Sequence, residues 1–308
     1  KGAGIGRGDY NSNLAHLYAH FVRHTIDTSR KGLTIVYDGV NVAGSSGGPE
    51  ILSGLGAKVI NININPDGLN INHHCGSTHI ESLQVAVQQH HADLGIANDG
   101  DADRCLLVDE KGQVLDGDQI MLLCALKLKE EGKLKGDTVV GTVMSNIGFH
   151  KAAEELGMKT VSTAVGDRYV LEYMREHDLS IGGEQSGHVI FLDHNTTGDG
   201  MLTAVQVAAL VKEKGQPLSE LAGIMTKYPQ VLINVRVATK TGWEENDIIK
   251  AAIVTAEGEL GDEGRVLVRA SGTEPLIRVM AEGPDQAALQ ALCQEIADII
   301  GREQGLAE

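Results

Sequence analysis

The chain has 308 residues, 42% of them hydrophobic and 22% charged, which is long enough for two or three domains rather than one core. Its 26 lysines and arginines against 42 aspartates and glutamates give a formal net charge of -16. This charge argues against nucleic acid and anionic membranes as partners. No apolar stretch approaches the roughly 20 residues of a membrane span. The cysteines lack CxxC spacing, which argues against a zinc site or a disulfide framework and favours a cytoplasmic location; they are Cys75, Cys105, Cys124 and Cys293.

The first part of the chain alternates β-branched runs with helical patterns, which is typical of α/β layers around parallel strands. The predicted strands are residues 33–38, 57–64 and 92–97. A glycine-rich stretch after the first strand leads into a helix ending near Leu55, and a second helix is expected at about 79–89. The third strand runs directly into an acidic loop. We assign this unit to residues 1–114.

The next part repeats this β-α plan, and we assign it to residues 115–226. The predicted strands are 137–143, 158–163 and two short strands within 180–193. The predicted helices are about 117–130, 147–156, 168–176 and 203–214. Two consecutive α/β domains with mixed sheets are therefore expected.

The last part, residues 227–308, has a different pattern. Residues 231–238 alternate apolar and polar side chains, as a strand with one solvated face does. A helix near 247–259, two strands at 265–269 and 276–282, and a final helix follow. The final helix has one apolar stripe, formed by Leu289, Cys293, Ile296 and Ile300. This pattern predicts a smaller α+β C-terminal domain.

The acidic loop carries Asp99, Asp101 and Asp103 at alternate positions, and only Arg104 offsets them. Oxygen ligands spaced in this way suit Mg²⁺ or Ca²⁺, and the loop follows a strand end, where α/β sheets bind ligands. An EF-hand is excluded because its sixth position would be Arg104 instead of glycine and because its flanks are predicted strands. The alternative is an acidic turn exposed to solvent.

The stretch RVLVRASGTEPLIR, residues 265–278, combines two guanidinium groups, two hydroxyls and a glycine in one loop between strands. These groups are mainly hydrogen-bond donors, as a phosphate ligand requires. The candidate phosphate contacts are Arg269, Ser271, Gly272, Thr273 and Arg278. The alternative is an ordinary Ser-Gly turn flanked by surface arginines.

A third candidate is GGEQSGH, residues 182–188. Glu184 can accept hydrogen bonds from neighbouring sugar hydroxyls, Ser186 can add a contact, and His188 could exchange protons near neutral pH. A histidine on a strand can equally be structural. Arg168 follows Gly-Asp at a predicted helix start, where N–H groups can bind an anion or an aspartate can act as a cap.

Three motifs, taken together and in chain order, resemble the α-D-phosphohexomutase family. They are DGDADR at 99–104, GEQSGH at 183–188 and RASGTEPLIR at 269–278. VMSNIG, VGDRYVLEYM and NTTGDG make the chain most similar to the bacterial branch that acts on phosphoglucosamine. The resemblance implies interconversion of glucosamine 6-phosphate and glucosamine 1-phosphate through a phosphoserine and a bisphosphate, a step of amino-sugar metabolism toward peptidoglycan precursors. It is compatible with a homodimer.

The resemblance also assigns roles to the candidate residues. It implies that Asp99, Asp101 and Asp103 bind Mg²⁺ and that Arg104 is the arginine following the metal loop. Glu184 and Ser186 would contact sugar hydroxyls, and His188 would take part in proton transfer. The loop that would hold the non-reacting phosphate consists of Arg269, Ser271, Gly272, Thr273 and Arg278.

The phosphoserine motif of the family, similar to TASHNP, has no counterpart in this sequence. We therefore interpret the chain as the second, third and fourth domains of a longer protein, and we expect this fragment alone to be inactive. Three alternatives stay open: a phosphoglucomutase or phosphomannomutase, a noncatalytic phosphosugar-binding module, and a haloacid-dehalogenase-like phosphatase with Asp99 as nucleophile. The phosphatase is disfavoured because Asp103 stands where that family has threonine or valine.

Overall fold

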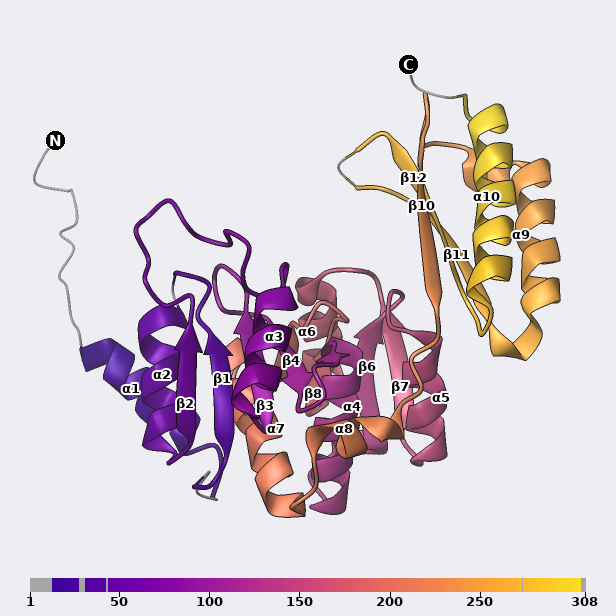
Figure 1. The fold of residues 1–308 in the computed structure, drawn as a ribbon. Helices are drawn as coiled ribbons and strands as arrows, with labels where there is room; N and C mark the ends of the chain where they lie inside the picture. The colour runs from indigo at the N-terminus through magenta and orange to yellow at the C-terminus, as the bar shows by residue number, and fades with distance from the viewer. Residues whose placement is uncertain (1–12, 28–30, 43, 273, 306–308) are drawn as a thin grey trace, which may run out of the picture. The chain divides into compact units, whose positions relative to one another are not determined.

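The computed structural model describes residues 13–27, 31–42, 44–272 and 274–305. The chain divides into two compact units (Figure 1): unit 1 consists of residues 1–145 and 152–225, and unit 2 consists of residues 146–151 and 226–308. None of the helices in the described ranges is long and apolar enough to cross a membrane. All four cysteines are buried free thiols.

The first sheet of unit 1 has five strands in the order β2-β1-β3-β4-β5. They are β1 Thr34–Asp38, β2 Lys58–Ile62, β3 Leu94–Asn98, β4 Cys105–Asp109 and β5 Val114–Leu115. Strand β1 is parallel to β2 and β3, whereas β4 runs antiparallel to β3 and β5 antiparallel to β4. All residues of β3 are buried, as expected of a strand covered on both faces. The accompanying helices are α1 Asn13–Arg23, α2 Gly44–Gly54 and α3 Glu81–His90.

The second sheet of unit 1 has four strands in the order β7-β6-β8-β9. They are β6 Thr138–Thr142, β7 Lys159–Thr163, β8 Ile181–Gly183 and β9 Val189–Phe191. Strand β6 is parallel to β7 and β8, and β9 is antiparallel to β8. The helices are α4 Gly117–Glu130, α6 Asp167–Glu176, α7 Gly200–Lys214 and α8 Leu218–Leu221. Helix α5, Ile147–Glu155, is divided between the units, with residues 147–151 in unit 2 and 152–155 in unit 1. Both sheets mix parallel and antiparallel strands, which confirms the predicted architecture.

Helix α7 contacts β3 and β4 of the first sheet and also α4, a helix that packs on β6 and β8 of the second sheet. It is almost entirely buried, which explains its nearly uniform apolar sequence. Asp199 starts the helix by accepting a hydrogen bond from the N–H of Leu202, and the N–H of Gly200 donates to the Ala102 carbonyl in the acidic loop. The start of α7 therefore fixes the acidic loop.

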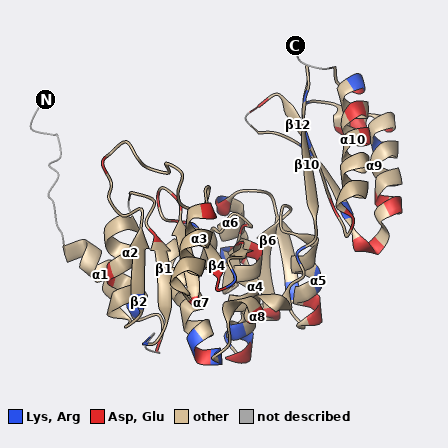
Figure 2. Ribbon diagram, in the orientation of Figure 1, with Lys and Arg blue, Asp and Glu red and all other residues tan. Residues whose placement is uncertain are grey.

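Unit 2 contains a three-stranded antiparallel sheet with the order β10-β12-β11. Its elements are β10 Gln230–Arg236, β11 Arg265–Ala270, β12 Leu276–Glu282, α9 Asp247–Leu260 and α10 Gln286–Glu303. The predicted stripe of α10 is buried in one apolar cluster with Val231, Val235 and Ile277 of the sheet. The predicted smaller α+β domain is confirmed. Acidic residues outnumber basic ones in both α9 and α10 (Figure 2).

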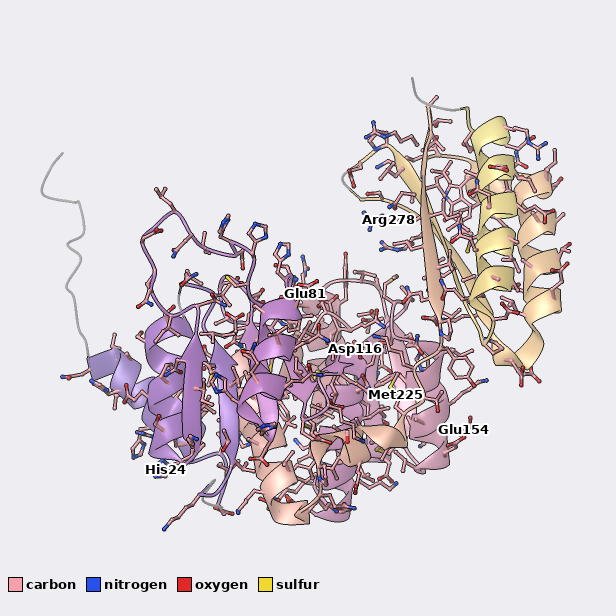
Figure 3. All side chains as sticks on the ribbon, in the orientation of Figure 1. His24, Glu81, Asp116, Glu154, Met225 and Arg278 are labelled. Atoms are coloured by element: carbon pink, nitrogen blue, oxygen red, sulfur yellow. The ribbon has the colours of Figure 1, made fainter. Side chains whose placement is uncertain are left out.

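The two faces of the sheet in unit 2 differ. Side chains alternate along a strand, and those of Val231, Val235 and Ile277 pack in the apolar cluster with α10. The residues next to them along each strand therefore point away from the two helices. Arg269 of β11 and Arg278 of β12 occupy such positions in one cross-strand row, and Figure 3 shows Arg278 on the face opposite the two helices. Arg269 and Arg278 thus lie on the sheet face that α9 and α10 leave open.

Two helices of unit 1 differ from the sequence predictions. Helix α1 was not predicted, and its larger apolar side chains, Leu14 and Leu17, are 62% and 64% exposed while its buried residues are the smaller Ala19 and Val22. Helix α2 begins at Gly44, inside the glycine-rich stretch expected to precede it.

The glycines of α2 have a packing function. A Cβ atom at Gly44 or Gly48 would lie 2.3 or 2.2 Å from side-chain atoms of Tyr37, which is fully buried beneath the helix. The glycines therefore permit close contact between α2 and β1. This explains why a helix forms from a sequence that is typical of a turn.

Candidate functional site

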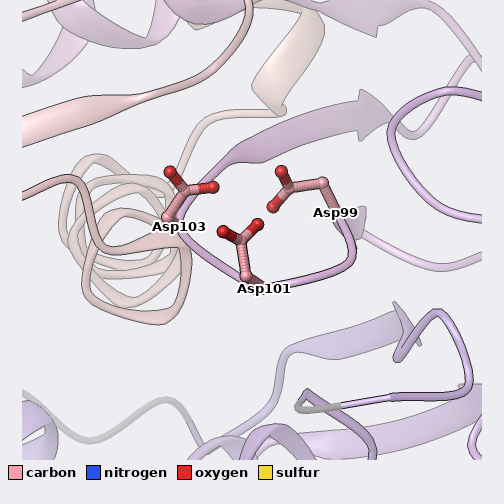
Figure 4. A group of neighbouring side chains, drawn as sticks. All are labelled: Asp99, Asp101 and Asp103. Atoms are coloured by element: carbon pink, nitrogen blue, oxygen red, sulfur yellow. The ribbon is translucent and has the colours of Figure 1, made fainter. Parts of the chain in front are cut away.

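The acidic loop, residues 99–104, connects β3 to β4. The hairpin register pairs Asn98 with Cys105, so the loop begins directly at the end of the buried strand. Asp99, Asp101 and Asp103 each present a carboxylate oxygen, and these oxygens lie within 4.8 Å of one another (Figure 4). The structure therefore brings the three predicted metal ligands together around one point.

The electrostatics of this loop favour a bound cation. Burial, followed by the charges of Asp103 and Asp101, raises the pKa of Asp99 to about 6, although the N–H of Arg104 acts in the opposite direction. The Oδ1 atom of Asp103 is buried without a hydrogen-bond partner, whereas buried carboxylate oxygens normally have one. Three hard oxygen donors, one of them unsatisfied, fit Mg²⁺ or Ca²⁺ and lack the nitrogen and sulfur ligands typical of zinc.

His188 lies directly behind the acidic loop and is only 3% exposed. Its Nδ1 is 2.8 Å from Asp103 Oδ2, and the N–H of Gly198 donates to its Nε2 at 3.0 Å. Because the Gly198 N–H can only donate, Nε2 is unprotonated, and the proton on Nδ1 is donated to Asp103. Burial alone would raise the pKa of Asp103, but hydrogen bonds with Asp99 and His188 keep it below its ordinary value.

These contacts hold the carboxylate of Asp103, a candidate metal ligand, in the way that outer partners hold metal-binding carboxylates. A Cβ atom at Gly198 would lie 2.5 Å from the His188 ring, so glycine is required for this approach. Proton transfer by His188 stays a prediction, since both ring nitrogens are engaged in this geometry.

The hairpin of β8 and β9 holds the predicted sugar loop, residues 183–188, against the acidic loop. The N–H of Cys105 donates to the Gly187 carbonyl at 3.0 Å, and Arg104 and His188 form an isolated antiparallel bridge. Gly187 has a φ of 97°, and a Cβ atom there would lie 2.4 Å from the Cys105 carbonyl oxygen. Only glycine fits this position. Two of the three predicted loops therefore form one site within unit 1.

The predicted contact residues differ in how much of each side chain is available to a ligand. Ser186 is exposed, and Glu184 is half-buried with its Oε1 accepting from the N–H of Gly166 at 2.9 Å. Arg104 is 44% exposed, with Nε 3.6 Å from Asp99 Oδ2. Arg168 is 79% exposed and pairs with Glu172 of its own helix at 2.7 Å.

In unit 2, Arg269 and Arg278 lie directly opposite each other on neighbouring strands. Like charges in this position repel each other, and burial followed by the Arg278 charge lowers the pKa of Arg269. Glu274 compensates Arg278 only in part, with a charged contact of 3.5 Å, and Arg278 Nε is buried without a hydrogen-bond partner. The pair is suited to an anion that accepts several hydrogen bonds, such as phosphate.

The loop between these arginines is closed by its own hydrogen bonds. The N–H of Ser271 donates to the Leu276 carbonyl at 2.8 Å, and the Ser271 hydroxyl accepts from the N–H of Glu274 at 3.3 Å. Gly272 is exposed, with open space where a Cβ would lie. Thr273, which was also predicted to contact phosphate, lies outside the described residues.

Sequence reasoning missed three residues that support these loops: Asn98, Gly198 and Lys240. Asn98 is buried, accepts a hydrogen bond from the Tyr37 hydroxyl at 3.0 Å and donates to the Arg104 carbonyl at 2.8 Å. The position of Asn98 directly before the acidic residues could have indicated that it supports the loop. Gly198 belongs to NTTGDG, a stretch noted only for its resemblance, and Lys240 stands in no recognisable motif.

An α/β fold with a cluster of carboxylates and a pair of arginines suited to an anion is typical of proteins that bind phosphate compounds with the help of a metal. Three protein-family models match the chain in order. They describe phosphoglucomutase/phosphomannomutase alpha/beta/alpha domain II at residues 10–112, alpha/beta/alpha domain III at 116–228, and the C-terminal domain at 232–299. The chain belongs to the phosphoglucomutase/phosphomannomutase family, which confirms the resemblance found in the sequence.

Several curated relatives carry the name phosphoglucosamine mutase. The one from Desulforamulus reducens is 53% identical over 300 residues, covering 97% of this chain and 68% of the relative. The one from Symbiobacterium thermophilum is 56% identical over 285 residues, covering 92% of this chain and 64% of the relative. The chain thus spans about two thirds of the length of these relatives.

Solved structures show the same fold. A phosphoglucomutase/phosphomannomutase family protein from Burkholderia thailandensis has a TM-score of 0.80 at 21% identity, covering 96% of this chain and 66% of that chain. N-acetylphosphoglucosamine mutase from Aspergillus fumigatus, in complex with GlcNAc-6P and magnesium, has a TM-score of 0.73 at 22% identity, covering 92% of this chain and 68% of that chain.

Proposed function

We propose that this chain carries the metal, sugar and phosphate sites of a phosphoglucosamine mutase, which interconverts glucosamine 6-phosphate and glucosamine 1-phosphate. The observation that carries the proposal is the convergence of Asp99, Asp101 and Asp103 within 4.8 Å, with the 183–188 loop hydrogen-bonded to the same turn. The names of the relatives and the ligands of the Aspergillus structure, GlcNAc-6P and magnesium, support it further.

Each site has a distinct part in the proposed reaction. Asp99, Asp101 and Asp103 would hold Mg²⁺, and the bound ion would stabilise negative charge on the phosphoryl group in transit. Arg269 and Arg278 hold the phosphate that does not react, so that remote binding positions the substrate. Glu184 and Ser186 contact two neighbouring sugar hydroxyls. Such contacts can form in both orientations of a sugar that turns around between the two steps.

The phosphoryl group comes from a phosphoserine on a further domain, which the family resemblance implies. The serine phosphate transfers its phosphoryl group to the free sugar hydroxyl, the resulting bisphosphate turns around, and the other phosphate returns to serine. Because TASHNP has no counterpart here, we propose that this chain binds phosphosugar weakly and does not turn it over. We keep the predicted domain limits, 1–114, 115–226 and 227–308, as part of this proposal.

A coupled assay for glucosamine 1-phosphate tests the proposed inactivity. The purified chain should bind glucosamine 6-phosphate in a calorimetric titration and give no product above background. The full-length phosphoglucosamine mutase from Desulforamulus reducens is the positive control for the assay. Turnover by the chain alone would show that the reaction does not need the phosphoserine.

The runner-up function is a phosphoglucomutase or phosphomannomutase, which the description of the family models favours. Competition titrations with glucosamine, glucose and mannose 6-phosphates separate these functions. Tightest binding of glucosamine 6-phosphate supports the proposal, and a preference for glucose or mannose 6-phosphate supports the alternative.

We further propose that the protein is cytoplasmic and forms a homodimer. The buried free cysteines are suited to a reducing compartment such as the cytoplasm. Light scattering after gel filtration tests the dimer.

A further inference from the structure

The segment that follows β10 runs beside the arginine loop of unit 2. The N–H of Val237 donates to the Pro275 carbonyl at 3.1 Å, at one end of the loop. Lys240 Nζ donates to the Ser271 carbonyl at 2.6 Å, at the other end. Lys240 therefore places an ammonium group directly on the loop that joins the two arginine-bearing strands.

Within the described part of the chain, the charge of Lys240 is not compensated by a carboxylate, unlike the charges of the partly buried Lys127 and Lys129. Lys127 lies 2.6 Å from Glu213, and Lys129 lies 3.1 Å from Asp137. Lys240 is also half-buried, yet among the residues that the structure describes its partner is a neutral carbonyl and no carboxylate pairs with it. An ammonium group has three donors, so hydrogen-bonding capacity remains after the contact with Ser271.

The net charge of the loop indicates which ligand charge would neutralise it. Arg269 and Arg278 contribute two positive charges, and Glu274 offsets one of them. Lys240 restores the balance to about two positive charges, which matches the charge of about -1.5 to -2 on a phosphate monoester at neutral pH. Without Lys240 the loop would offer about half of the positive charge that such a ligand requires.

We propose that Lys240 is a third cationic contact of the phosphate site, held in position by the Ser271 carbonyl. The ligand class is a phosphate monoester dianion, and the inference rests on the proposed phosphosugar function. Arg269 and Arg278 supply flat donor groups with directional hydrogen bonds, whereas Lys240 supplies a compact point charge. The competing interpretation is that Lys240 only ties down the backbone of the loop.

Calorimetric titrations with glucosamine 6-phosphate and with inorganic phosphate, each at several KCl concentrations, distinguish the two interpretations. Lys240→Gln keeps an amide donor for the Ser271 carbonyl but removes the charge. We expect it to bind both ligands about tenfold more weakly and with a shallower salt dependence. Lys240→Arg should retain most of the affinity, and Lys250→Gln, on the exposed surface of α9, should behave like the wild type. Thermal unfolding of each variant checks the fold.

The outcomes separate this inference from the proposed function. Wild-type affinity and salt dependence in Lys240→Gln, with binding lost in Arg269→Ala, would overturn the role of Lys240 and leave the proposed function standing. An equal loss in Lys240→Arg and Lys240→Gln would likewise overturn it. If inorganic phosphate binds in a Lys240-dependent way but glucosamine 6-phosphate does not, the phosphate site stands and the proposed substrate fails. If neither ligand binds the wild type, both proposals fail.

Discussion

In unit 1 the acidic loop is held by hydrogen bonds with its neighbours: the Cys105 N–H donates to the Gly187 carbonyl, the Gly200 N–H donates to the Ala102 carbonyl, and the Asn98 side-chain amide donates to the Arg104 carbonyl. In unit 2, by contrast, Arg269 and Arg278 face each other with like charges and one partial counter-charge. The candidate cation site is thus fixed mainly by geometry, whereas the candidate anion site is defined mainly by its incompletely compensated charge.

This difference has a physical reason. A small hard cation needs several oxygen atoms at short and nearly equal distances, so small displacements of a ligand weaken binding. A phosphate group accepts hydrogen bonds over a wide range of directions, and charge dominates its attraction. Substitutions that alter the backbone should therefore affect unit 1 more strongly, and substitutions that alter charge should affect the phosphate loop of unit 2.

A matched pair of glycine substitutions gives the largest expected difference between the two regions. Gly187→Ala combines a φ of 97° with a contact of 2.4 Å to the Cys105 carbonyl oxygen, and it should cost about 3 kcal/mol of unfolding free energy. In Gly272→Ala the added methyl group faces open space, and the free energy of unfolding should change by less than about 0.5 kcal/mol. Denaturant unfolding of both variants measures these free energies. Equal losses would contradict the contrast between the loops.

Arg269→Ala should weaken binding of glucosamine 6-phosphate by at least about thirtyfold, because it leaves Arg278 without its partner in holding the anion. Binding of Mg²⁺ should stay unchanged, since no acidic-loop residue is altered. Titrations of both ligands measure the effect, and the exposed Arg302→Ala is the control for charge loss. A comparable loss of Mg²⁺ affinity would show that the two sites do not act separately.

His188→Gln should weaken Mg²⁺ binding by about tenfold, because Asp103 loses the partner that orients its carboxylate. The affinity for inorganic phosphate should not change. The exposed His90→Gln serves as the control, and calorimetry provides the measurement. Unaltered Mg²⁺ affinity in His188→Gln would remove the basis for treating His188 as a positioning residue.

The smallest expected effect is a dependence of Mg²⁺ binding on pH. With the pKa of Asp99 raised to about 6, the metal-free loop holds a proton below that pH, and Mg²⁺ must displace it. Affinity should therefore fall by about fourfold from pH 7 to pH 5.5 and level off above pH 7. Asp99→Asn, although it binds more weakly, should lose this step, and a step of the same size in that variant would assign it to another group.

Local features of the chain were readable from the sequence. The alternate spacing of Asp99, Asp101 and Asp103 sufficed because one short loop must bring its side chains together. Helix α4 at 117–130 and strand β12 at 276–282 begin and end where their patterns predicted. The same holds for the apolar stripe of α10, which is a property of a single helix.

Contacts between distant segments were not readable. His188 and Asp103 are separated by 85 positions, so the orienting hydrogen bond between them requires the packed hairpin of β8 and β9. Lys240 and Ser271 are 31 positions apart and share no pattern. The start of α2 could not be predicted because its glycines are set by the ring of Tyr37 on another element.

The most direct test of the account is a calorimetric titration of Mg²⁺ into the wild-type chain and into Asp101→Asn. We predict one Mg²⁺ per wild-type chain and at least about a hundredfold weaker binding in Asp101→Asn, because one of the three predicted charged ligands is lost. Asp262→Asn, an exposed aspartate of unit 2, should bind like the wild type. Undetectable binding to the wild type, or equal binding to wild type and Asp101→Asn, would contradict the account.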